Sequence, residues 1–245
     1  MKNFKKMGFY SLALALAFTF SSCDEDDSDS EPDVENEDPS TETGTVTDSE
    51  GNTYSTVVIG NLEWMSENLR TSSAIGTVEC YDEDSDNCGV YGNLYDFTAI
   101  TQGEDPSNNR LQGICPDGWF LPRRDDFSDM VNFAGSGTYL PDDLKADSDL
   151  WFGSGAGNNE TGFSALPGGR LNISDDGAGN LTYNFVDITQ TASIWWIGHI
   201  DNTDQFFAGS FAIPAGGNQF SYGDMNSQSE VINNRATSCR CVKPV

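Results

Sequence analysis

An acidic run near the N-terminus sets the strongest limit on where this chain can fold. Residues 24–50 hold thirteen Asp and Glu, no Lys or Arg, and almost no apolar side chains. Such a segment buries too little apolar surface to offset the entropy that it loses on ordering. We therefore expect a disordered, self-repelling tether over residues 23–43 and a folded domain over residues 44–245.

The segment before the acidic run has the three parts of a signal peptide. Three lysines come first, residues 8–20 are apolar, and two serines precede Cys23. The apolar stretch is shorter than the about 20 residues that a transmembrane helix needs. The arrangement resembles a bacterial lipoprotein signal, which implies cleavage of residues 1–22 and attachment of diacylglycerol and an N-acyl chain such as palmitate to Cys23. The alternatives are an uncleaved anchor and a secretory signal with a free cysteine.

Acidic residues directly after a lipidated cysteine resemble the surface-export signal of Bacteroidetes lipoproteins. That resemblance implies a lipid anchor in the outer membrane and a domain exposed at the cell surface. The membrane is then a partner through the N-terminal lipid alone. From Gly51 onward, the chain has 26 acidic and nine basic residues, which gives a net charge near −17. Nucleic acid and anionic lipid are disfavoured as partners of such a domain.

β-branched residues predict a hairpin at the start of the domain. Residues 45–47 and 53–59 flank a turn in which Gly51 and Asn52 tolerate a positive φ. The clearest helix is predicted from Asp125 to Ala134, because apolar residues recur there at i, i+3, i+4 and i+7.

A shorter helix is expected after Pro141. Later apolar segments between Gly-rich loops predict strands at residues 162–166, 181–186, 193–200, 205–213 and 236–242. The fold class is a single α+β domain with short antiparallel strands, one main helix and many loops.

Five ordered blocks of the sequence carry a resemblance to a known family. They are Asp48-x-x-Gly51-Asn52-x-Tyr54-x-x-Val57-x-Ile59-Gly60-x-x-x-Trp64-Met65-x-Glu67-Asn68-Leu69, Tyr91-Gly92-x-Leu94-Tyr95, Cys115-Pro116-x-Gly118-Trp119-x-Leu121-Pro122, residues 162–170 (GFSALPGGR) and Arg240-Cys241-Val242-Lys243. They resemble the Fibrobacter succinogenes major paralogous domain family. The resemblance implies an extracytoplasmic, often lipid-anchored domain whose activity is not established.

A second resemblance concerns the fold. A Trp-x-Leu-Pro segment before a helix, with a final strand after Arg240, is similar to the C-type-lectin-like fold, which includes relatives of formylglycine-generating enzymes. It implies a C-type-lectin-like domain. One departure is Arg123, where family members carry a Ser or Thr that caps the helix; such a cap contributes about 1 kcal/mol.

Five cysteines remain after Cys23, so at least one is unpaired. Cys80 and Cys88 flank a short loop and can close it as a disulfide. Cys115 with Cys241 is the second expected pair, although Cys239 lies two residues from Cys241 and either could reach Cys115. A reactive catalytic thiol is the alternative, and it is disfavoured because no histidine lies near these cysteines in the sequence.

Asp82, Asp84 and Asp86 alternate in a pattern that can wrap Ca²⁺. An EF-hand loop requires Gly at its sixth position and Glu at its twelfth, and this chain has Asn87 and Asn93 there. A solvated acidic loop is the alternative. No other cofactor is expected, and His199, the only histidine, excludes a multi-histidine zinc site.

Aromatic residues carry the remaining functional signal. Trp195 and Trp196 are adjacent in a predicted strand, so one must face away from the other, and one of them is the candidate for an exposed ligand contact. Arg170, after two glycines, either contacts a ligand or pairs with a carboxylate.

These observations favour a non-catalytic surface module that binds or adheres to glycan or protein. An enzyme on a lectin-like scaffold and a structural subunit of a surface or fimbria-like assembly are the alternatives.

Overall fold

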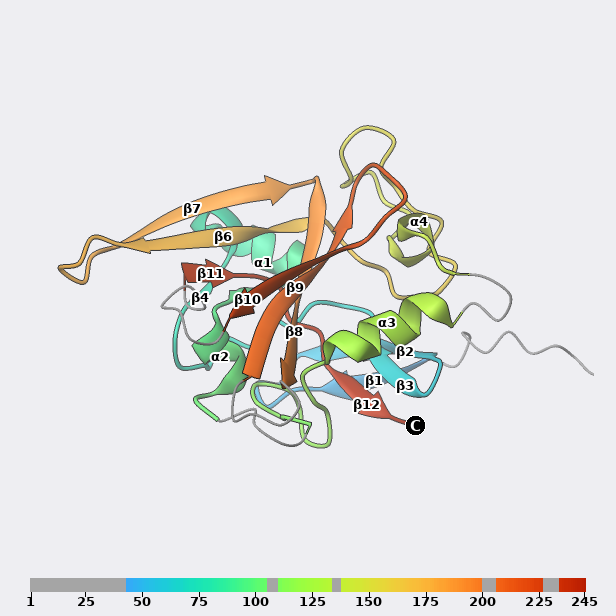
Figure 1. Cartoon of the computed structure of the whole chain (residues 1–245), viewed down its shortest axis with the longest axis horizontal. Helices are drawn as coiled ribbons and strands as arrows, with labels where there is room; N and C mark the ends of the chain where they lie inside the picture. Colours follow the sequence, from blue (N-terminus) through green and yellow to red (C-terminus); the bar gives the residue numbers. More distant parts are fainter. Residues whose placement is uncertain (1–42, 105–109, 134–137, 200–205, 227–233) are drawn as a thin grey trace, which may run out of the picture. The chain divides into compact units, whose positions relative to one another are not determined.

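The computed structural model describes residues 43–104, 110–133, 138–199, 206–226 and 234–245. All of them belong to one compact unit, Asp38–Val245. The predicted signal peptide, the predicted lipidation site Cys23 and residues 24–42 of the predicted tether lie outside the described residues. Thr43, the last residue of the predicted tether, lies in a strand instead. The described part is a mixed α+β domain of small antiparallel sheets with few helices (Figure 1).

The first sheet joins the two ends of the domain. Its order is β1-β2-β3-β12, and its strands are β1 (Thr43–Thr47), β2 (Thr53–Ile59), β3 (Leu62–Met65) and β12 (Val242–Pro244). The predicted β1–β2 hairpin is confirmed, with Thr43 opposite Val57 and Thr47 opposite Thr53. The sequence pattern missed β3, because four residues are too few to display a period.

The second sheet has the order β10-β9-β8 and supplies the centre of the core. Its strands are β8 (Thr191–His199), β9 (Phe206–Pro214) and β10 (Ser221–Asn226). β8 and β9 were predicted within a few residues, although the predicted ends Ile200 and Gln205 lie outside the described residues, and β10 was missed. The outer edge of β8 is covered, since Trp195 N–H donates to the carbonyl of Ser238 and Ile197 N–H to that of Pro122.

A long hairpin forms the third sheet, with the order β11-β6-β7. Its strands are β6 (Gly168–Asp175), β7 (Leu181–Ile188) and β11 (Arg235–Ala236), and Figure 1 shows the hairpin projecting beyond its neighbours. A fourth, two-stranded sheet pairs β4 (Val78–Glu79) with β5 (Leu94–Tyr95).

Two strand predictions are wrong. Residues 162–166 form a loop with a single bridge from Ala165 to Lys145, because the Asn159 side chain accepts from Ser164 N–H and fixes a turn. Residues 236–242 do not form one strand: β11 ends at Ala236 and β12 begins at Val242. The residues between them pair in turn with β5, β8 and the segment after β3.

The helices are short. They are the 3₁₀ helix η1 (Tyr81–Glu83), α1 (Ser85–Tyr91), α2 (Phe97–Thr101), α3 (Arg124–Asn132) and α4 (Pro141–Leu144). α3 and α4 confirm the two predicted helices, and the predicted end of α3 at Ala134 lies outside the described residues. Although Arg123 offers no acceptor as N-cap, the Asp126 carboxylate accepts its backbone N–H at 2.7 Å.

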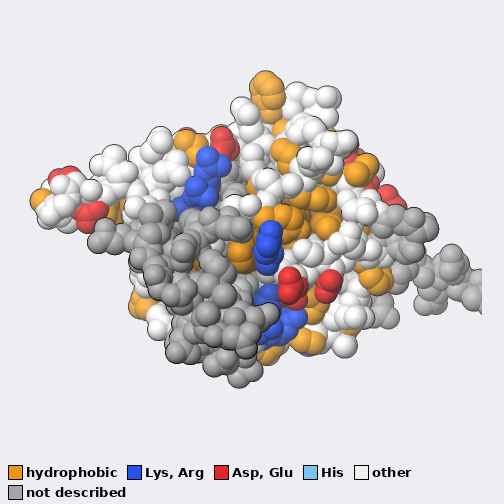
Figure 2. Space-filling model, in the orientation of Figure 1, with side chains coloured by type: hydrophobic (Ala, Val, Ile, Leu, Met, Phe, Trp, Pro, Cys, Tyr) orange, Lys and Arg blue, Asp and Glu red, His pale blue; other side chains and the backbone are white. Residues whose placement is uncertain are grey.

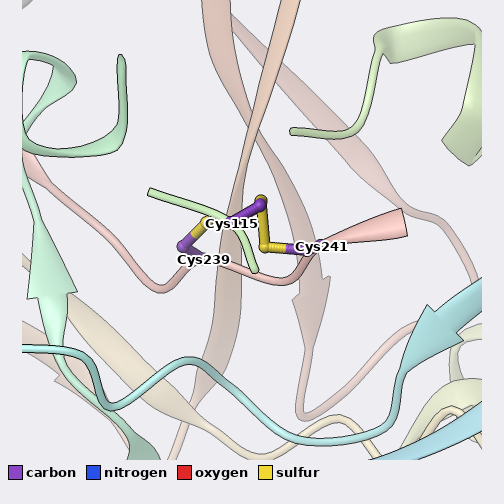
Figure 3. A group of neighbouring side chains, drawn as sticks. All are labelled: Cys115, Cys239 and Cys241. Carbon is purple, nitrogen blue, oxygen red and sulfur yellow. A yellow bond between two sulfur atoms is a disulfide. The ribbon is translucent and has the colours of Figure 1, made fainter. Parts of the chain in front are cut away.

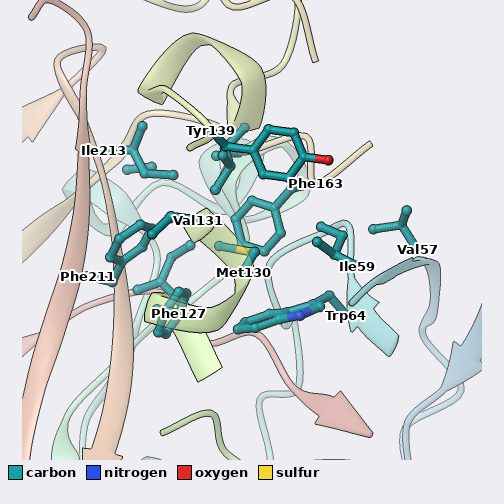
Figure 4. Packing of buried hydrophobic residues seen from close by; sticks show 14 of the residues in the cluster. Val57, Ile59, Trp64, Phe127, Met130, Val131, Tyr139, Phe163, Phe211 and Ile213 are labelled. Atoms are coloured by element: carbon teal, nitrogen blue, oxygen red, sulfur yellow. The ribbon is translucent and has the colours of Figure 1, made fainter. Parts of the chain in front are cut away.

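The main core lies on both faces of β8. Trp195 and Ile197 point into one apolar cluster, while Ile194 and Trp196 point into the other. Figure 4 shows the second cluster, where α3 packs on the sheets. Its rings are in contact: Trp64 lies 4.9 Å from Phe127, and Phe127 lies 4.4 Å from Phe211, between ring centroids. A third cluster lies under the β6–β7 hairpin.

Candidate functional site

The residues that carry the family resemblance meet at a buried arginine. Arg240 is 1% exposed. Its Nε donates to Asn68 Oδ1 at 2.7 Å, one terminal nitrogen donates to the carbonyl of Phe163, and the other donates to the carbonyl of Ser164 at 3.0 Å. The guanidinium also lies over the Phe163 ring, 4.4 Å from its centroid. We call these four residues the Arg240 hub.

The hub links three of the five sequence blocks, so its role is to hold the fold together. Burial lowers the pKa of Arg240 to about 9, which leaves the side chain charged at neutral pH. The charge is solvated by carbonyl and amide oxygens instead of a paired carboxylate. Because the guanidinium is sealed from solvent, it cannot contact a ligand.

Asp48 fixes the β1–β2 turn in a similar way. Its carboxylate accepts from the hydroxyls of Tyr54 and Thr71, both at 2.7 Å, from the Asn52 amide, and from the backbone N–H groups of Glu50 and Asn52. Burial raises the pKa of Asp48, but these hydrogen bonds outweigh it and bring the pKa down to about 2. The carboxylate is therefore ionised and fully occupied by the protein itself.

Both expected disulfides are present. Cys80 is bonded to Cys88, and Cys115 is bonded to Cys241. Cys239 is free and buried, and burial raises the pKa of its thiol to about 12. Such a thiol is protonated at neutral pH, which argues against its use as a catalytic nucleophile.

The predicted exposed contact at Trp195 or Trp196 is wrong. Trp195 is fully buried and Trp196 is 3% exposed, because apolar clusters cover both faces of β8. The Trp196 ring lies over its cross-strand partner Gly209, where an added Cβ would stand 2.5 Å from the ring. Neither indole can stack on a ligand.

Arg170 follows the second of its two predicted roles. It lies in β6, and its guanidinium forms an ion pair with Asp187 of β7 at 2.5 Å. Its Nε is buried without a hydrogen-bond partner among the described residues. The sequence prediction of a ligand contact through this residue therefore has no direct support in the geometry.

The calcium pattern does not assemble into a site. Asp82 belongs to η1, Asp84 caps α1 by accepting from Asp86 N–H at 3.0 Å, and all three are exposed. Within the described ranges, the group of side chains close enough to share a metal ion is Cys115, Cys239 and Cys241, and two of these are disulfide-bonded. Helix capping explains why Asp84 occupies its position. The side chain of His199 lies outside the described residues.

Unlike the buried residues described so far, one group of residues lines a concave site. We call it the Phe152 pocket. It has a volume of about 480 Å³ and lies between the loop after Trp151, the β7–β8 turn and the end of β9. Its lining residues are Phe152, Gly153, Ser154, Gly155, Gln190, Thr191, Pro214, Ala215 and Gly216.

Backbone hydrogen bonds hold the walls of the Phe152 pocket together. Phe152 N–H donates to the carbonyl of Thr189, and Ala215 N–H donates to that of Gln190, both at 2.7 Å. Gly155 is required at its position, since an added Cβ would stand 2.8 Å from the Ala215 carbonyl oxygen. From below, the buried Lys145 ammonium donates to the same carbonyl at 3.1 Å and pairs with Asp142 at 2.6 Å.

The chemistry of the pocket is neutral and amphipathic. None of its lining side chains is titratable in the ordinary pH range. Phe152 is 66% exposed, Ser154 and Gln190 are exposed too, and Gly153 and Gly216 present open backbone. An uncovered phenyl ring beside hydroxyl and amide groups can stack on and hydrogen-bond a polar, uncharged ligand.

Ala215 of the pocket packs against the second apolar cluster, as do the partly buried Phe133, Phe220 and Tyr222. Figure 2 shows hydrophobic side chains gathered on one face of the domain with charged ones at the border. Arg124 lies over the Tyr222 ring, 5.1 Å from its centroid.

Comparison with known proteins identifies the family of this chain. The model of the Fibrobacter succinogenes major domain matches residues 57–243, and the chain belongs to that family. No curated protein and no solved structure matches the chain. In the part of the chain that the structure describes, no helix is both long enough and apolar enough to cross a membrane.

Sequence reasoning missed the Phe152 pocket. Its residues fall between the family blocks and come from three separate segments. Residues 153–157 (GSGAG) form a Gly-rich stretch that carries no motif for a binding site. The one signal in the sequence is a phenylalanine directly before that stretch, and only the structure shows that its side chain is exposed.

Proposed function

We propose that this chain is a lipid-anchored cell-surface protein that binds glycan through the Phe152 pocket without catalysis. The observation that carries the proposal is the combination of an exposed Phe152 ring and uncharged polar groups around one cavity of about 480 Å³. Sugar rings present an apolar face and a rim of hydroxyls, so they match such a lining. The wider adhesion role follows if the glycan belongs to another surface.

The charge of the domain narrows the ligand class. With a net charge near −17 after residue 50, the domain repels anionic chains, and no lysine or arginine lines the pocket to offset this. Uncharged glycans are therefore favoured over sulfated or uronate-rich ones. A protein ligand remains the other candidate occupant.

A glycan array with the purified full chain tests the proposal. We expect binding to uncharged glycans that falls at least tenfold in Phe152→Ala, because a stacked phenyl ring contributes about 1.5 kcal/mol or more. Leu181→Ala, another exposed apolar residue that lies in β7, is the matched control and should bind like the wild type. Absence of binding to every glycan, or equal binding by both variants, would remove glycan binding at this pocket.

The location is a separate proposal that rests on the leader and Cys23. Lipidation of Cys23 would anchor the protein in the outer membrane, with the domain at the cell surface. Cys23→Ser should release folded domain from the membrane fraction, and protease added to intact cells should digest the wild-type domain. A variant that stays in the membrane fraction would contradict the lipid anchor.

A further part of the proposal concerns the fold class of the domain. A C-type-lectin-like scaffold is supported by the Leu121-Pro122 segment that leads into α3 and by a final strand, β12, that pairs with β3 beside the first hairpin. Binding without catalysis is favoured at the Phe152 pocket, because none of its lining side chains is titratable in the ordinary pH range.

A structural subunit of a surface assembly is the second candidate function. It is favoured by β7, which lies at the edge of its three-stranded sheet with no further strand beside it in the described residues. An exposed strand edge can pair with another chain. Asn184→Pro would block such pairing, so an oligomer of the purified chain that persists in this variant would argue against it.

A further inference from the structure

Three sulfur atoms meet in one buried cluster near the C-terminus (Figure 3). The Sγ atoms of Cys115, Cys239 and Cys241 all lie within 4.8 Å of one another. Cys115 is 4% exposed and the other two are fully buried. The bond joins Cys115 to Cys241, so a free thiol lies beside an intact disulfide.

The backbone holds both C-terminal cysteines toward Cys115. Leu69 N–H donates to the carbonyl of Cys239 at 2.8 Å, and Met65 N–H donates to that of Cys241 at 3.1 Å. Residues two apart in an extended segment point to the same side. A disulfide needs a sulfur separation of about 2.05 Å, so Cys239 Sγ has to move by no more than about 3 Å to bond with Cys115.

We propose that Cys239 is a second disulfide partner of Cys115, and that the domain interconverts between a Cys115–Cys241 and a Cys115–Cys239 pairing by thiol–disulfide exchange. In the exchange, the Cys239 thiolate attacks Cys115 Sγ, a new bond forms between them, and the old bond to Cys241 breaks. Cys241 leaves as a thiolate and takes up the proton that Cys239 gave up. The number of thiols and disulfides is unchanged, so no oxidant or reductant is consumed.

Burial decides when the exchange runs. The high pKa of Cys239 leaves little thiolate at neutral pH, and the enclosed cluster admits no external thiol. The Cys115–Cys241 pairing is therefore kept while the domain is closed. Exchange takes place when the C-terminal segment has locally unfolded. The cross-link between the segment before α3 and the C-terminal segment consequently survives the loss of either C-terminal cysteine.

The Cys241→Ser variant of the full chain tests the proposal. After folding under the oxidising conditions used for the wild type, peptide mapping without reduction should find Cys115 linked to Cys239. Cys239→Ser is the matched control and should keep the Cys115–Cys241 bond. A folded Cys241→Ser protein with the Cys80–Cys88 bond intact but Cys115 and Cys239 both free would overturn the proposal.

A measurement on the wild type covers the case in which the variant fails to fold. The full chain is held at pH 9 in mild denaturant, quenched with acid, then denatured and alkylated with N-ethylmaleimide. We expect label on Cys241 as well as on Cys239. The fraction on Cys241 should grow about tenfold faster for each pH unit of increase below the thiol pKa, because the thiolate is the attacking species. Label confined to Cys239 at every pH and time would overturn the proposal.

Discussion

The Arg240 hub and the Phe152 pocket are built from opposite kinds of residue. The hub takes its side chains from the sequence blocks that carry the family resemblance, and Phe163 at its centre is fully buried. The pocket takes its side chains from the loops between those blocks, and Phe152 is 66% exposed. The blocks that carry the family resemblance thus build the hub, whereas the proposed ligand would contact residues outside those blocks. The family match itself spans both regions.

The strongest test compares the two phenylalanines directly. Phe163→Ala should lower the free energy of unfolding by about 4 kcal/mol, since it removes a buried ring that contacts Trp64 and Arg240. Phe152→Ala should change it by less than about 0.5 kcal/mol. Urea unfolding followed by tryptophan fluorescence measures both. Similar values for the two variants would break the division between hub and pocket.

A second test removes the cation of the hub. Arg240→Met should cost about 3 kcal/mol, because the Asn68 side-chain oxygen and the carbonyls of Phe163 and Ser164 lose their donors in a buried site. Lys243→Met is the control in the same block. Its ion pair with Glu63 is half exposed and contributes less than about 1 kcal/mol. If Arg240→Met left the free energy of unfolding unchanged, the hub would not be structural.

Asp48 gives the fold a predicted acid sensitivity. Its pKa of about 2 in the folded state lies below its ordinary value of 3.8, so the ionised form stabilises the fold above about pH 4. That contribution is lost as the pH falls toward 2. Asp48→Asn should therefore cost about 2 kcal/mol at pH 7 and much less at pH 2.

Urea midpoints of wild type and Asp48→Asn, measured at both pH values, check this prediction. Asp86→Asn, an exposed position in α1, is the control and should not move the midpoint at pH 7. An Asp48→Asn penalty that stays constant from pH 7 to pH 2 would contradict the assignment of the pKa shift to this carboxylate.

The smallest stability effect is expected at the pocket. Gln190→Ala removes an exposed amide and should change the unfolding free energy by less than about 0.5 kcal/mol. Its affinity for a glycan that binds the wild type should nevertheless fall several-fold, because a hydrogen bond contributes about 1 kcal/mol. Calorimetric titration with that glycan measures the loss. Lower affinity together with lower stability would move Gln190 to the structural side of the comparison.

Local sequence patterns predicted the elements whose own residues specify their secondary structure. The β1–β2 hairpin was predicted from β-branched residues on both sides of a turn, and α3 from apolar residues at i, i+3, i+4 and i+7. The prediction of α4 rested on Pro141, and that of β7 to β9 on apolar segments between Gly-rich loops. The pattern fails where non-local contacts decide the structure. Residues 236–242 look like one strand, but Thr237, Ser238 and Cys239 pair with three different elements, and each pairing depends on the tertiary fold.

The disulfide pairs were within reach of sequence reasoning, whereas the site was not. Spacing alone suggested Cys80 with Cys88. By contrast, the burial of Trp196 depends on Gly209, its partner in a strand thirteen residues away. The uninterrupted apolar run 194–197 is the one local sign that both faces of β8 are covered. The Phe152 pocket likewise joins residues from 152 to 216 and has no local signature.

The sheet that holds both ends of the domain also decides how the domain would respond to a pull. β1 is an edge strand, and Thr43, where the chain enters, pairs with Val57 at the open end of the hairpin. If Cys23 carries the proposed lipid anchor and Phe152 the proposed ligand, tension between them would load these pairs one after another, so that β1 separates from β2 pair by pair. The peeling would reach the Asp48 turn last, where five hydrogen bonds converge on one carboxylate. Once separated from β2, the residues of β1 would add to the length of the predicted tether before the core unfolds.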